Sequence, residues 1–252
     1  RISYTFGVPA VVAHGSWTFG GGDIPSGRLA LDRRVDGTVS GLASFDAYSA
    51  GDARLALAPV RFSGDRSGLL RFATKAELSG PIGDGRVDRL SIPLAGALAP
   101  TGALALNGGC TRIGVDRLAV SGFRIGATGI DLCSRAGSPL LSAGPGGLRG
   151  IVRIPAVRLR GTSGSSPFAF DARNGEVDLA SLRWAVALAD VRLGQGDSVT
   201  RFAAKRIAGR STPQGMAGEL AGASGKIGPV PLNMSDIGGQ WRWAGGALTW
   251  NG

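Results

Sequence analysis

The side chains that most often carry out catalysis and bind metals are scarce in this sequence. One histidine, two cysteines and three lysines occur among 252 residues. A nucleophilic hydrolase usually needs a histidine base beside its nucleophile, and we expect the single His14, in VVAHGSW, to be structural or exposed. A structural zinc site needs about four Cys or His ligands, whereas the three present here lie far apart. We therefore expect no metal and no cofactor.

Nucleotide-binding motifs are also lacking, although the chain has 43 glycines. Neither GxxxxGK[ST] nor a strand-GxGxxG-helix arrangement occurs, and GPGGLRG at 144–150 lacks the required spacing. Paired carboxylates for glycoside chemistry stay open at this stage, because any two of the 18 acids could meet in space. Most of these acids lie beside arginine or glycine in turn-like sequence, so we expect structural roles and a protein that is not an enzyme.

Long apolar runs and helical periodicity are missing as well. The longest charge-free stretch, 90–111, is about as long as a membrane span, but prolines and glycines interrupt it. Only 198–208 has a composition that allows a turn or two of helix. The chain starts without methionine or leader, so we interpret it as a segment of a longer protein whose location a missing signal peptide does not reveal.

What the sequence does contain is alternation of apolar and polar residues with a period of two. Successive side chains of a strand point to opposite faces, so such alternation predicts strands with one apolar side. The residues that we expect on this apolar side are Leu90, Ile92, Leu94, Leu118, Val120, Leu182, Trp184, Val186, Leu188, Trp241 and Trp243.

Turn sequences such as GDG at 83–85, NGG at 107–109 and GQG at 194–196 separate the expected strands at short intervals. The string Val-Asp-Arg-Leu occurs at both 87–90 and 115–118, and VDLASLRWAVAL at 177–188 resembles it. Similar units in succession indicate a sheet that grows by addition. We predict an all-β fold with at most short helices, in one segment over 1–252, with a possible weak sub-boundary near 161–167.

The formal charge of +10 comes almost entirely from arginine. A basic balance of this size suggests an anionic partner. Nucleic acid is not expected, because adjacent basic residues occur only at 33–34 and 205–206 and no aromatic-and-basic RNA signature is present. Two interpretations stay open: a solvated strand face rich in arginine, or contact with anionic lipid headgroups.

The two cysteines lie at the ends of one alternating run. Cys110 precedes strand-like residues 113–120, Ser121 and Gly122 offer a bend, and the chain returns to Cys133. The ends of a strand pair or short meander can come within bridging distance. We predict a Cys110–Cys133 disulfide, which stabilises by about 3 kcal/mol in the chain-entropy model and is typical of the periplasm or the exterior.

Several stretches together resemble one protein family. VDRLSIPLAGAL, NGGCTRIGVDRLAVSGFRI, IDLC and GPVPLNMSDIGGQWRWAGGALTWNG look like parts of the AsmA-like envelope proteins of bridge type, most of all their YdbH branch. The resemblance runs over most of 50–252 and is weak before that. It implies an elongated, strongly twisted antiparallel β-meander that curls into an open, taco-like groove.

The resemblance also implies a function. Such proteins carry phospholipids between the inner and outer membranes across the periplasm by passive sliding, without chemistry. An inner-membrane anchor and an outer-membrane lipoprotein are expected at the two ends of the full-length protein. The apolar residues named above would then line the groove; alternation alone cannot separate a groove from an ordinary core. The alternatives are a structural or adhesive β-solenoid, for which four asparagines and an irregular repeat are unfavourable, and a carbohydrate-active β-fold enzyme.

Overall fold

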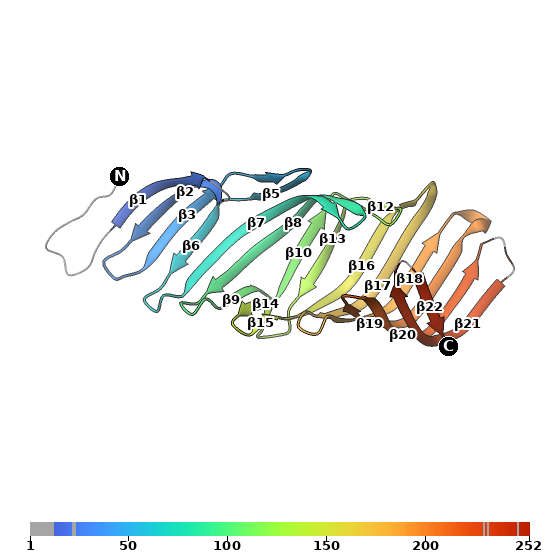
Figure 1. Cartoon of the computed structure of the whole chain (residues 1–252). Helices are drawn as coiled ribbons and strands as arrows, with labels where there is room; N and C mark the ends of the chain where they lie inside the picture. Colours follow the sequence, from blue (N-terminus) through green and yellow to red (C-terminus); the bar gives the residue numbers. More distant parts are fainter. Residues whose placement is uncertain (1–12, 22–23, 229, 231, 246) are drawn as a thin grey trace.

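The chain forms one antiparallel sheet of 22 strands. The structure is a computed structural model, and it describes residues 13–21, 24–228, 230, 232–245 and 247–252 (Figure 1). The prediction of an all-β antiparallel meander is confirmed. One short 3-10 turn, η1 (Gly196–Ser198), interrupts the strands. The stretch 198–208, considered for helix, is instead mostly strand, because Ala203, Ala204 and Phe202 pair with β-strands on both sides.

The first third of the sheet is built from long hairpins. Its strands, in spatial order, are β1 (Ala13–Gly21), β2 (Ile24–Arg33), β3 (Val39–Phe45), β6 (Val60–Gly64), β7 (Leu70–Ile82) and β8 (Gly85–Leu98). A small hairpin consists of β4 (Tyr48–Ala50) and β5 (Ala53–Leu57). Its strand β5 pairs with β7 on the same edge as β6, further along the strand.

In the middle third, short strands take the place of long ones. The strands β10 (Cys110–Val115) and β11 (Arg117–Val120) follow one another along β8, and β12 (Phe123–Ile125) and β13 (Thr128–Cys133) return beside them. The remaining strands, β9 (Leu104–Gly108), β14 (Pro139–Gly144) and β15 (Gly147–Arg149), extend one edge of the sheet from β8.

The last third is a regular meander. It consists of β16 (Ile151–Ser163), β17 (Ser166–Asp178), β18 (Arg183–Leu193), β19 (Thr200–Thr212), β20 (Gly215–Ile227), β21 (Leu232–Ala244) and β22 (Ala247–Asn251). Residues 161–167, named above as a possible sub-boundary, lie in the β16–β17 hairpin, where Ser163 pairs with Ser166.

The molecule is elongated, with β1 and β22 at opposite ends of the sheet (Figure 1). Its accessible surface is 15,809 Å², whereas a compact protein of 25.6 kDa is expected to expose about 10,400 Å². No large side chain among the described residues is fully buried, and about half of the buried apolar residues are alanines. The excess surface arises because no second layer of described residues covers the sheet.

Glycines on one face indicate the direction in which the sheet curls. A Cβ atom on Gly41, Gly96, Gly161 or Gly218 would lie 1.9 to 2.4 Å from a carbonyl oxygen of the adjacent strand. The neighbouring backbone thus occupies the space that a side chain would need, so only glycine allows this close approach. All four glycines lie on the same, apolar side, and the sheet is therefore concave on that side.

A line of backbone irregularities, which we call the crease, crosses the longest strands. It consists of positions with φ between 50° and 55°, namely Arg89, Asn174, Leu188, Gly222 and Asp236. Register shifts accompany the crease in the β7–β8, β17–β18 and β20–β21 pairs. Such bulges bend a strand and shift its side-chain alternation by one residue. Each strand can thereby keep apolar residues on one face above and below the bend.

Candidate functional site: an apolar groove

The concave side of the sheet carries a continuous set of large apolar side chains, which we call the apolar face. Cross-strand pairs connect its members from one end of the molecule to the other, and most of them are only half-buried. Representative members are Trp17, Leu29, Phe62, Phe72, Ile92, Leu118, Ile125, Val152, Phe170, Trp184, Phe202, Leu220, Trp241 and Trp250.

Nine of the eleven residues predicted from alternation lie on the apolar face. In β8, the three predicted residues pair with β7 across the face, as Leu90 with Leu78, Ile92 with Ala76 and Leu94 with Thr74. The other six are Leu118, Val120, Trp184, Val186, Trp241 and Trp243, which pair in the same way with β12, β19, β20 and β22. The structure thus brings together residues that lie as far as 153 positions apart in the sequence.

Two of the predicted positions depart from the pattern. Leu182 lies in the turn before β18, with φ of 53°, and is 51% exposed. Leu188 lies in the crease, with φ of 50°, and is 56% exposed. Simple alternation assigned both to the apolar face, but a turn and a bulge each break the period of two. Neither residue has a cross-strand partner in the ladder, so alternation does not assign either of them to the face of Trp184 and Val186.

The sequence analysis missed the floor of the groove, which is a row of alanines. Ala172, Ala189, Ala204 and Ala223 lie next to the crease on neighbouring strands and are only 1 to 4% exposed. They are among the most buried of the described side chains because the strands bend around them. A methyl group fits inside such a bend where a larger side chain would not. In the sequence, Ala172, Ala189 and Ala204 each lie two residues from a large apolar residue of the same strand face, namely Phe170, Val191 and Phe202. A search for alternating large apolar residues does not detect them.

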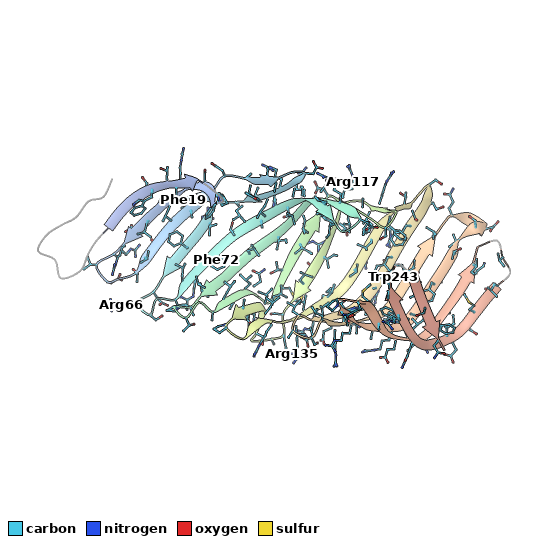
Figure 2. All side chains as sticks on the ribbon, in the orientation of Figure 1. Phe19, Arg66, Phe72, Arg117, Arg135 and Trp243 are labelled. Atoms are coloured by element: carbon cyan, nitrogen blue, oxygen red, sulfur yellow. A yellow bond between two sulfur atoms is a disulfide. The ribbon has the colours of Figure 1, made fainter. Side chains whose placement is uncertain are left out.

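Aromatic rings on the apolar face also escaped the sequence analysis. Phe19 and Phe45 meet at 5.6 Å between ring centroids above Gly27, and Phe123 and Phe168 meet at 4.7 Å. Phe19 and Phe72 lie over the face of the sheet, while labelled arginines such as Arg117 project beyond its long edges (Figure 2). Rings that lie over glycine cover backbone that would otherwise be exposed, so they smooth the groove surface.

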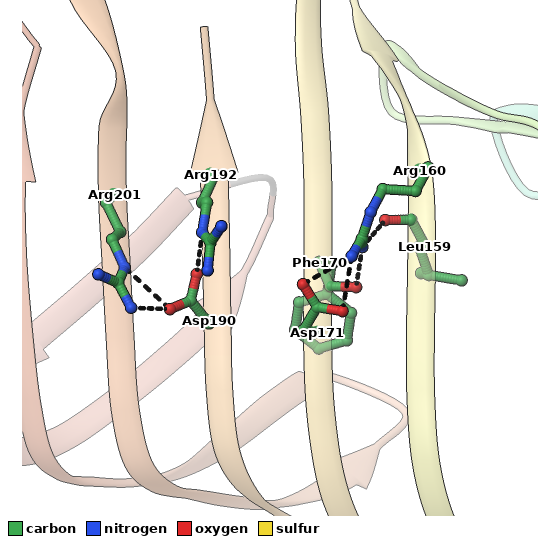
Figure 3. A network of polar contacts seen from close by, with 7 residues as sticks. All are labelled: Leu159, Arg160, Phe170, Asp171, Asp190, Arg192 and Arg201. Carbon is green, nitrogen blue, oxygen red and sulfur yellow. Dashed lines mark hydrogen bonds and ion pairs between the residues drawn. The ribbon is translucent and has the colours of Figure 1, made fainter. Parts of the chain in front are cut away.

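The opposite, polar face carries arginines and carboxylates in cross-strand pairs. Asp171 and Asp190 lie directly opposite each other in β17 and β18, an arrangement that is unfavourable for like charges. Arginines on both sides compensate it, since Arg160 binds Asp171 at 2.8 Å while Arg192 and Arg201 both bind Asp190 (Figure 3). Burial raises the pKa of Asp190, but these two arginines outweigh it and hold that pKa below its usual value.

The disulfide predicted from the sequence is present. Cys110 and Cys133 are direct partners in the β10–β13 pair and their sulfur atoms are 2.05 Å apart. They alternate with Ile113 and Leu132, so the bond lies on the polar face. Ser134 continues the closure, because its backbone N–H donates to Gly109 O at 2.7 Å and its Oγ accepts from Gly109 N at 2.9 Å. The cystine thus secures the sheet without taking space in the groove.

Within the described ranges, no three His, Cys, Asp or Glu side chains gather in a way that could hold a metal ion. No helix among the described residues is long and apolar enough to cross a membrane. His14 lies in β1 opposite Asp32, and its side chain is outside the described part.

Comparison of the chain with protein-family models, with curated proteins and with solved structures gives no match.

Proposed function

We propose that this chain is a section of a periplasmic, bridge-like lipid-transfer protein of AsmA-like type. Its apolar face serves as a groove in which phospholipid acyl chains slide between the inner and outer membranes, without a chemical step. The single observation that carries this proposal is the concave apolar face, which continues over the whole sheet while no described layer covers it.

The physical cost of such a face in water supports a bound apolar partner. Soluble monomers rarely expose contiguous apolar patches of more than a few hundred Å². Here Trp17, Leu55, Leu78, Trp243 and Trp250 are each at least 36% exposed and lie on the same face. Acyl chains would remove this surface from water at roughly 25 cal/mol per Å², while headgroups would stay at the open side.

The proposal is tested by native mass spectrometry and lipid extraction on the purified 252-residue chain. Phospholipid at near-stoichiometric amounts is the expected result. A photo-crosslinking amino acid at Val186 should label lipid, and the same group at Ala169 should not. Ala169 is the matched control because it lies on the polar face between Arg160 and Arg192. A folded, lipid-free chain with no label at Val186 would instead support a structural or adhesive role.

A further inference from the structure

The row of residues that crosses the polar face near the β17–β18, β19–β20 and β21–β22 turns differs from the rest of that face. Arg183 and Arg210 are direct cross-strand partners, Ala217 pairs with Arg210, and Arg242 pairs with Ala217. Arginine therefore occupies three of four successive positions in one cross-strand row. Directly opposite like charges are unfavourable in a sheet unless something compensates them.

No hydrogen bond or ion pair of the described residues neutralises these three arginines, although Asp178 lies directly opposite Arg183 and interacts with it electrostatically. Most carboxylates of the polar face bind a basic residue, as in Arg112–Asp131, Arg160–Asp171 and the Asp190 pairs. By contrast, no described residue forms a hydrogen bond or ion pair with the guanidinium groups of Arg183, Arg210 or Arg242, which are all exposed. The arrangement keeps positive charge available.

Three carboxylates, Glu176, Asp178 and Glu219, lie near the row and reduce its positive charge without cancelling it, since four arginines face them. Asp178 accepts hydrogen bonds from Ser181 Oγ at 2.7 Å and from Ala180 N at 2.9 Å, so its oxygens are directed into the β17–β18 turn. Glu219 lies 3.8 Å from Arg206, and both side chains are more than half exposed. These contacts leave the arginine row with excess positive charge.

The same residues line a cavity of about 960 Å³. Arg183, Arg206, Arg210 and Arg242 all contribute to it. Between them lie Ala185, Ala208 and Ala217, whose short side chains leave room above the sheet. The arginines supply positive charge and the alanines leave space between them, so the cavity can hold an anion larger than chloride.

We propose that Arg183, Arg210 and Arg242 form a binding site for a phosphate group, separate from the apolar groove. Arg210 and Arg242 lie on the two strands beside Ala217, and Arg183 lies one strand further. Strands are about 4.8 Å apart, so the long arginine side chains can extend over this row toward one bound phosphate. Guanidinium groups bind phosphate oxygens in a bidentate manner, which gives this site its preference for phosphate over monovalent anions of one atom. The phosphate belongs either to a soluble phosphorylated compound or to an anionic lipid headgroup, and the experiment separates the two.

The test compares two triple variants of equal charge. The site variant is Arg183→Gln, Arg210→Gln, Arg242→Gln. The control variant is Arg28→Gln, Arg61→Gln, Arg124→Gln, which removes three exposed polar-face arginines that do not form one row: β3 separates Arg28 from Arg61, and Arg124 lies further along the sheet in β12. Binding of inorganic pyrophosphate is measured by calorimetry, and binding to phosphatidylglycerol vesicles by co-sedimentation, with phosphatidylcholine vesicles as reference.

We expect the site variant to lose affinity by about 10- to 100-fold, and the control to lose less than about threefold. Loss of pyrophosphate binding in the site variant identifies a soluble phosphate ligand; loss of vesicle binding alone identifies a lipid headgroup. Equal losses in both variants would show that net charge acts without a site, and absence of binding by the unmodified chain would equally overturn the proposal. Circular dichroism checks that both variants are folded. Lipid in the groove is measured independently, so failure of this site leaves the groove proposal standing.

Discussion

Two strands, β19 and β20, separate Trp184 in β18 from Trp241 in β21, but the centroids of the two rings are only 5.7 Å from each other. The contact is possible because Gly209 and Gly218 are their cross-strand neighbours on β19 and β20. A Cβ atom on Gly209 would lie 2.8 Å from the ring of Trp184 and 2.9 Å from that of Trp241. The two rings thus cover two strands of bare backbone with one apolar surface.

A charge placed on this surface should interfere with lipid binding more than with folding. We predict that Val186→Glu lowers bound phospholipid by more than about tenfold, because an ionised carboxylate is costly beside acyl chains. The half-buried Val186 side chain has solvent access, so the melting temperature should change little. The control Ala169→Glu on the polar face should keep its lipid. If Val186→Glu unfolds the chain, the face is a sealed core and not a groove.

The curl of the sheet should depend on its glycines. A Cβ at Gly218 would lie 1.9 Å from the carbonyl oxygen of Ala208, a backbone atom that cannot move away freely. We predict that Gly218→Ala lowers the free energy of unfolding by about 1–3 kcal/mol. Gly108→Ala is the control, since nothing lies within 4 Å of its Cβ position, and should change it by less than about 0.5 kcal/mol. Urea denaturation measures both; equal midpoints would contradict the argument.

The Asp190 cluster should make stability depend on pH. Its pKa is lowered in the folded protein, so ionised Asp190 contributes stability above its unfolded pKa, and this contribution is lost as the pH falls through the folded value. Asp190 is 15% exposed and binds two arginines, so Asp190→Asn should cost about 1.5–3 kcal/mol at pH 7.

The difference between the Asp190→Asn variant and the unmodified chain should shrink below about pH 4. The control is Asp131→Asn, whose pair with Arg112 is about half exposed and should contribute less than about 1 kcal/mol. A difference at Asp190 that persists unchanged into acid would exclude the ion pairs as its source.

The cystine should stabilise the middle of the sheet in particular. It closes a separation of 23 residues, so Cys110→Ala together with Cys133→Ala should lower the free energy of unfolding by about 3 kcal/mol. Hydrogen exchange should speed up most in β10 and β13. Reduction of the unmodified chain should have the same effect as the double variant. Uniform acceleration across all strands would show that the bond acts on the whole chain and not on this pair.

Much of the fold could be predicted, because strand alternation is a local property. Leu90, Ile92 and Leu94 alternate with Ser91 and Pro93, and this is enough to place them on one face. The disulfide followed from two cysteines at the ends of one meander. The crease could not be predicted, since Arg89 and Leu188 have ordinary sequence surroundings and their positive φ depends on neighbouring strands bending together.

The arginine row could not be predicted for a related reason. Arg183, Arg210 and Arg242 become neighbours only through the register of four strands. In the sequence they are separated by 27 and 32 residues, and nothing distinguishes them from arginines that bind a carboxylate. The same holds for the alanine row, which is a row only across strands. A row of residues that forms across several strands depends on the strand register, so the order of residues along the chain does not reveal it.

The nearest-neighbour pairing of the strands has a consequence for how this molecule unfolds. Among the described residues, strands β17 to β21 each pair only with the strands beside them in the sequence, so no strand pair of this part joins one end of the sheet to the other. Unfolding can then proceed hairpin by hairpin from an end, and its cooperativity spans a few strands and not the entire chain. Such a chain can gain or lose a hairpin with little effect on distant strands, so its length can vary while the local structure of the sheet stays the same.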